Sequence, residues 1–203
     1  MNYTDNNEAL AFGSEMSFEE LRKLSESYIN KNLKESRKQH TLRVVDEGIK
    51  LAERFGADKE KVIIASLLHD MAKNLSDEEM DRLIDKYGIP SRYHGNPNLA
   101  HGKLAAFMIE EKFGIKDEEL LRAVSYHTTG CENMSCVEKI VFLADAIEPG
   151  RTYPGVDTIR EAAETSLDKA CLISLNRTID YISSKGYYLD PDTIKARDYL
   201  IKT

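Results

Sequence analysis

The pair His69-Asp70 closes the apolar run of residues 62–68 and constrains the fold of this chain more than any other feature. Four other titratable residues lie at helical spacing on apolar stripes in separate segments. They are His40, His101, His127 and Asp145. Burying so many polar side chains is costly unless something inside the protein pairs with them. The fold is therefore expected to bring the ends of several segments to one internal site.

The spacing of apolar residues predicts helices throughout, with no strand-like alternation. Ser or Asp residues precede the apolar stripes as N-caps, and Gly or Pro residues follow them. The expected helices cover about 18–29, 36–55, 58–70, 76–87, 98–113, 117–127, 135–148, 157–184 and 190 onward. This pattern predicts an all-α fold of roughly eight or nine helices without a sheet. Residues 1–16 are expected to form a flexible arm, and residues 17–203 a single domain.

Bulk properties exclude several classes of function. The 203 residues carry a formal net charge of −7, which argues against nonspecific binding to nucleic acid. No apolar run approaches the ~20 residues that a membrane-spanning helix requires, and no secretory signal pattern is visible. The sequence therefore favours a cytoplasmic protein without a nucleic-acid or membrane partner. The sequence is also compatible with a homodimer.

A shared metal ion accounts for the buried polar set better than separate explanations do. Any one histidine at the end of an apolar stripe is most often a hydrogen-bonded core residue, but this explanation would have to hold for the whole set at once. Imidazole and carboxylate ligands suit iron, manganese, zinc or nickel. Three basic residues lie close in sequence to the expected ligands: Arg37, Lys73 and Arg151. They are suited to phosphate oxygens, whereas no P-loop or Rossmann glycine motif is present.

Taken together, these segments resemble the HD-domain metal-dependent phosphohydrolases, and among them the bacterial YqeK family of symmetrical diadenosine tetraphosphate (Ap4A) hydrolases. The matching strings are Ser36-Arg37-x-x-His40, Leu67-Leu68-His69-Asp70-x-Ala72-Lys73, His101-Gly102, His127-Thr128-Thr129-Gly130 and Ala144-Asp145-x-Ile147-Glu148-Pro149-x-Arg151. The resemblance covers about residues 17–202. It implies an all-α HD domain that binds iron and cleaves Ap4A in the middle of its phosphate chain to give two ADP.

The resemblance also suggests roles for individual residues. His40, His69, Asp70 and Asp145 are expected to bind the metal, with one or two iron ions as the first choice and manganese, zinc or nickel as alternatives. Asp70 or Asp145 would orient the attacking water. His101 and His127 would either bind a second metal bridged by Asp70 or contact the phosphates and assist catalysis. The second role is favoured. Arg37, Lys73 and Arg151 would hold phosphate oxygens of a dinucleoside polyphosphate or an ADP-like nucleotide.

Three alternatives share this set of residues. An HD phosphohydrolase acting on a dNTP, a cyclic nucleotide or an alarmone nucleotide is the main one. An HD-like iron oxygenase would consume oxygen, and a noncatalytic nucleotide sensor would give no product. A further hypothesis concerns the nucleoside: an aromatic ring can stack on a purine, and Tyr153, Tyr187 and Tyr188 are the candidates. The competing interpretation is that these tyrosines cover the edges of the core.

Overall fold

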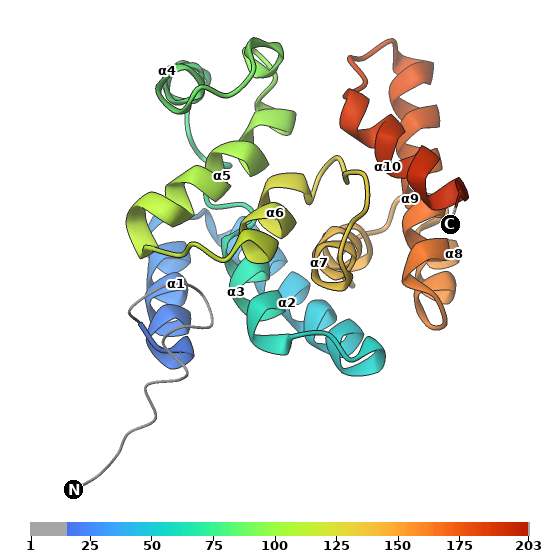
Figure 1. Ribbon diagram of the computed structural model, residues 1–203, viewed down its shortest axis with the longest axis horizontal. Coiled ribbons are helices and arrows are strands. Elements are labelled where there is room, and N and C mark those ends of the chain that lie inside the picture. The colour runs from blue at the N-terminus through green and yellow to red at the C-terminus, as the bar shows by residue number, and fades with distance from the viewer. Residues whose placement is uncertain (1–15, 203) are drawn as a thin grey trace, which may run out of the picture.

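The computed structural model describes residues 16–202, and within this range it contains helices and no strand (Figure 1). The all-α prediction is confirmed. The ten α-helices and one 3₁₀ helix are α1 (Phe18–Asn32), α2 (Glu35–Phe55), α3 (Lys59–Leu68), α4 (Asp77–Tyr87), η1 (Ser91–Tyr93), α5 (Pro97–Phe113), α6 (Glu118–Tyr126), α7 (Cys136–Ile147), α8 (Val156–Ala163), α9 (Leu167–Lys185) and α10 (Pro191–Lys202).

Local signals in the sequence start several of these helices. Three of them begin with a complete capping box, in which a serine side chain accepts the N–H of the glutamate three residues later and the glutamate accepts the serine N–H in return. The three pairs are Ser17 with Glu20, Ser76 with Glu79, and Ser135 with Glu138. These helices therefore begin where short-range hydrogen bonding predicts them to begin.

The prediction of one long helix over residues 157–184 is wrong. The chain forms α8 and α9 instead, with a turn at Glu164 and Thr165 between them. The Ser166 side chain accepts a hydrogen bond from the N–H of Lys169, so it caps the start of α9. This break lets α8 pack beside α9 (Figure 1). It also accounts for ten helices instead of the expected eight or nine.

Close helix contacts position the ends of α2, α3, α5 and α6 around one interior point. At Gly48 in α2, a Cβ atom would lie 2.9 Å from Cγ1 of Val62 in α3, so glycine lets these two helices approach closely. At Gly102 in α5, a Cβ atom would lie 3.1 Å from the ring of His127, which follows α6. The helix α7 contacts α2, α3 and α6 and completes the surroundings of this point.

The predicted arm at residues 1–16 lies outside the described residues except for Met16, which packs against the core. Among the helices of residues 16–202, none is long and apolar enough to cross a membrane.

Candidate active site

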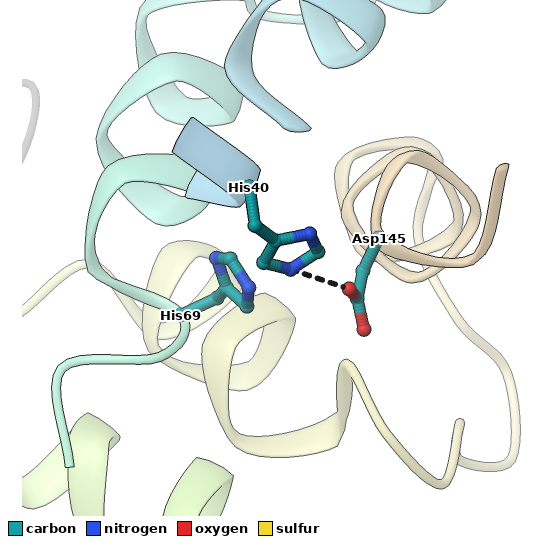
Figure 2. Close-up of side chains that lie close together, drawn as sticks. All are labelled: His40, His69 and Asp145. Atoms are coloured by element: carbon teal, nitrogen blue, oxygen red, sulfur yellow. Dashed lines mark ion pairs between the residues drawn. The ribbon is translucent and has the colours of Figure 1, made fainter. Parts of the chain in front are cut away.

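The predicted ligands converge from five elements of the fold. His40 lies in α2, His69 and Asp70 lie in the turn after α3, His101 lies in α5, His127 follows α6, and Asp145 lies in α7. All of them are buried except Asp145, whose side chain is 20 % exposed. Figure 2 shows His40, His69 and Asp145 pointing toward one another from three different elements.

His40 is held between two carboxylates. Its Nδ1 lies 3.1 Å from Oε1 of Glu148, and its Nε2 lies 3.0 Å from Oδ1 of Asp145. Burial raises the pKa of Glu148, but hydrogen bonds from Arg43, the Gly150 N–H and His40 outweigh it and lower that pKa to about 2. The ionised Glu148 thus accepts a hydrogen bond from the Nδ1–H of His40. The lone pair of Nε2 then faces Asp145, an arrangement that a cation stabilises.

His69 lies beside these residues with its ring orientation fixed by the backbone. Its Nδ1 donates to the carbonyl oxygen of Ser66 at 2.7 Å, so Nε2 is left as the free nitrogen. This Nε2 is fully buried and has no hydrogen-bond partner among the described residues. Burial lowers the pKa of His69, but the negative charges of Asp70 and Asp145 outweigh it and raise that pKa. The electrostatic field at Nε2 therefore attracts positive charge.

Asp70 joins the two sides of the site. Its Oδ2 accepts from Arg37 at 2.8 Å and lies 3.9 Å from Nε2 of His40. Its Oδ1 lies 3.2 Å from Nε2 of His101 and 4.0 Å from Nε2 of His127. Its Oδ2 also lies 3.5 Å from Nε2 of His69, so this one carboxylate faces all four histidines of the site at ion-pair distances, as a bridging group would.

The second pair of histidines is packed ring to ring. Nε2 of His101 lies 3.0 Å from Nε2 of His127, and Nδ1 of His127 donates to the carbonyl oxygen of Val124 at 2.7 Å. Burial and the neighbouring His101 and His69 lower the pKa of His127 to about 3. Burial also lowers the pKa of His101. Both rings are therefore neutral near pH 7, which is the form that ligates metals.

Two groups of three residues could each hold a metal ion, because their ligand atoms lie within 4.8 Å of one another. The first is His40, His69 and Asp145, and the second is His69, Asp70 and His127. His69 belongs to both groups, and its buried Nε2, which makes no hydrogen bond among the described residues and lies 3.5 Å from Oδ2 of Asp70, is the observation that fits a metal best. The nitrogen and oxygen donors suit a first-row transition metal.

The three predicted phosphate-binding residues surround this cluster. Arg37 binds Asp70, and Arg151 binds the Asp145 carboxylate and donates from Nε to the Asp145 carbonyl oxygen at 2.8 Å. Lys73 places its Nζ 3.4 Å from Nδ1 of His101. Burial lowers the pKa of Lys73. The three side chains thus bring positive charge to the edge of an otherwise acidic centre.

Glu148, Arg43 and Arg160 support the site, although sequence reasoning gave them no role. Glu148 is 2 % exposed and binds Arg43 at 2.5 Å as well as His40. Arg160 donates to the carbonyl oxygens of Ile147, Glu148 and Arg151, and so holds the loop that carries Arg151. Two signals pointed to Glu148: it lies three residues after Asp145, at the end of α7, and it belongs to one of the strings that carry the family resemblance.

Comparisons with known proteins agree with a site built from histidines and aspartates in an HD domain. Residues 37–150 match the family model described as HD domain. The chain is 38 % identical to the "Bis(5'-nucleosyl)-tetraphosphatase, symmetrical" of Bacillus subtilis (strain 168), over 85 % of this chain and 94 % of the relative. The protein of the same name from Halalkalibacterium halodurans is 40 % identical, over 85 % of this chain and 93 % of the relative.

A crystal structure provides an independent comparison of the fold. It is that of a predicted HD superfamily hydrolase involved in NAD metabolism from Clostridium acetobutylicum, with a TM-score of 0.84 and 40 % sequence identity. The match covers 92 % of this chain and 98 % of the other. The fold, the convergent histidines and aspartates and the shared length agree: this chain belongs to the HD-domain family and, within it, to the YqeK-type family of symmetrical bis(5'-nucleosyl)-tetraphosphatases.

Proposed function

We propose that the chain hydrolyses Ap4A symmetrically to two ADP in a metal-dependent reaction, with residues 17–203 acting as one HD phosphohydrolase domain. The names of the relatives support the substrate, since the matches cover most of both chains. The observation that carries the proposal in this structure is the buried Nε2 of His69, which makes no hydrogen bond among the described residues and belongs to the residue that both possible metal-binding groups share. Three basic residues, Arg37, Lys73 and Arg151, contact the members of this cluster from its edge.

His40, His69, Asp70 and Asp145 are proposed to hold the metal. The family resemblance makes iron the first choice, while the donor set alone would also suit manganese, zinc or nickel. Glu148 and the Ser66 carbonyl oxygen support this assignment, because each accepts a hydrogen bond from the Nδ1–H of a ligand histidine and leaves the lone pair of its Nε2 available.

His101 and His127 are proposed to act as neutral side chains. They either complete a second metal site with Asp70 or contact the phosphate chain; in the second case the hydrogen bond would be donated by His101, because the single N–H of neutral His127 is bonded to the Val124 carbonyl oxygen. Their lowered pKa values support both roles over a charged imidazolium. Metal analysis separates the two: two ions per chain favour the second site, and one ion favours phosphate contacts.

The chain's own residues would bind and orient the tetraphosphate. Arg37, Lys73 and Arg151 would take phosphate oxygens, and their present contacts with Asp70, His101 and Asp145 hold them in place before the substrate arrives. Asp70 or Asp145 would orient the attacking water and accept its proton. A bound metal lowers the pKa of water toward ~7 and polarises the phosphoryl group.

Product analysis tests the proposal. Purified protein with its measured metal content is incubated with Ap4A, and the nucleotides are separated by chromatography. ADP as the sole product supports symmetrical cleavage, whereas equal amounts of ATP and AMP would show asymmetric cleavage. No turnover of Ap4A, together with hydrolysis of a dNTP, a cyclic nucleotide or an alarmone nucleotide, would favour the alternative HD phosphohydrolase activity.

A further inference from the structure

A cavity separate from the cluster of histidines and aspartates lies beside the loop that follows Arg151. Its volume is about 510 Å³. Tyr153, Pro154 and Ile159 form one wall, and residues of α9 form the other. It lies within the size range of small-molecule sites, which are mostly apolar with a few polar groups. No residue of this cavity belongs to the two possible metal-binding groups.

A short piece of backbone, hydrogen-bonded to α7, connects the cavity to the active site. Arg151 donates to the Asp145 carbonyl oxygen, and the Tyr153 hydroxyl donates to the carbonyl oxygen of the next residue, Ala146, at 2.8 Å. The expected phosphate-binding residue and the wall of the cavity are thus two residues apart. A ligand whose phosphates reach Arg151 can place its other end against Tyr153.

The lining of the cavity suits a nucleoside. The Arg177 guanidinium lies 5.6 Å from the centre of the Tyr153 ring, and its Nε is buried without a hydrogen-bond partner among the described residues. Ser174 and Thr178 add two hydroxyl groups, which can pair with ribose hydroxyls or ring nitrogens. The Tyr181 ring, which is 57 % exposed at the cavity, offers a surface on which a planar base can stack.

We propose that this cavity binds the adenosine of one ADP half of the substrate, an inference that rests on the proposed function. The phosphates of that half would lie at Arg151, and the base would lie between the Tyr153 side and Tyr181. Among the three tyrosines considered from the sequence, this singles out Tyr153. Tyr187 and Tyr188 are 61 % and 45 % exposed and do not line the cavity.

Binding measurements on the metal-loaded protein test the site without relying on catalysis. ADP and inorganic pyrophosphate are titrated calorimetrically into the wild type and two variants. Thr178→Met fills the cavity, and Tyr181→Ala removes the exposed ring. Each variant is expected to bind ADP at least about fivefold more weakly, since base stacking on an aromatic ring contributes ~1–3 kcal/mol. Pyrophosphate affinity is expected to change less than twofold, because it lacks the nucleoside.

Asn176→Met is the matched control, because Asn176 is exposed on the same helix and does not line the cavity. Unchanged ADP affinity in both cavity variants would overturn the inference, and so would an equal loss for ADP and pyrophosphate. Failure of the proposed function is distinct: the wild type would then bind ADP through this cavity but release no ADP from Ap4A.

Discussion

Oε1 of Glu148 lies 3.1 Å from Nδ1 of His40, on the side of the ring opposite the Asp145 carboxylate. A buried carboxylate in this position fixes the tautomer and orientation of the imidazole and makes Nε2 a stronger ligand. Arg43 and the N–H of Gly150 hold the carboxylate in place. The metal affinity proposed for this site would therefore depend on Glu148, a residue that would not touch the metal.

Glu148→Gln removes the negative charge and keeps the shape of the side chain. It is expected to weaken metal binding roughly tenfold to a hundredfold, as measured by calorimetric titration of metal-free protein with iron(II) or manganese(II). Glu161→Gln, an exposed change on α8, serves as the control. Equal metal affinities for the wild type and Glu148→Gln would contradict the role given to Glu148.

Asp70→Ala removes the carboxylate that faces both halves of the site. Turnover of Ap4A is expected to fall at least about a hundredfold, the scale seen when one electrostatic contact to a transition state is lost. The measurement is the initial rate of ADP release, with folding checked by circular dichroism because Arg37 also loses its partner. Asp180→Ala, exposed on α9, is the control. A folded Asp70→Ala protein with a near wild-type rate would sink the mechanism.

Local patterns in the sequence predicted most of the helices and the candidate residues of the site. Capping boxes and apolar spacing act within a few residues, so the stripes that end at His40 and His69 were visible without a structure. The break before Ser166 was missed because apolar residues continue at helical spacing on both sides of it. A single serine cap is a weaker signal than this spacing. The contact of Glu148 with Arg43 joins residues more than a hundred positions apart. No local pattern reports such a contact.

Gly102→Ala tests the close approach of α5 to His127. A Cβ atom here would lie 3.1 Å from Nδ1 and Cε1 of the ring and 3.1 Å from the Ser125 carbonyl oxygen, so the ring and this backbone must shift by a few tenths of an ångström. Small displacements of a catalytic group are costly, and kcat is expected to fall about tenfold. With five histidines in the chain, the Cε1–H resonance of His127 can be assigned and followed. An unchanged resonance and an unchanged kcat would show that the ring tolerates the methyl group.

Lys103 makes the stability of the fold depend on pH. Its side chain is 9 % exposed in α5, with Nζ 3.2 Å from the centre of the Tyr126 ring and 3.6 Å from Oδ2 of Asp192. Burial lowers the pKa of Lys103 to about 8, and the nearby Asp192 and Asp190 compensate only in part. The ordinary value for lysine is about 10.4. The folded protein therefore releases this proton at a lower pH than the unfolded chain does.

Between pH 8 and about 10.4 the unfolded chain binds more protons at Lys103, so this residue makes the free energy of unfolding rise with pH. The gain in the free energy of unfolding approaches about 3 kcal/mol near pH 10.4. Below pH 8 the folded state bears the full cost of burying the charged Lys103. Urea unfolding of the wild type and Lys103→Met at pH 7.5 and pH 10 measures this effect. The difference in free energy of unfolding between the two proteins is compared at the two pH values, so that the contributions of other titrating groups cancel. The wild type is expected to gain stability relative to Lys103→Met as the pH rises. Lys112→Met, an exposed change on the same helix, is the control. If the stability difference between the wild type and Lys103→Met is the same at both pH values, the lowered pKa of Lys103 is refuted.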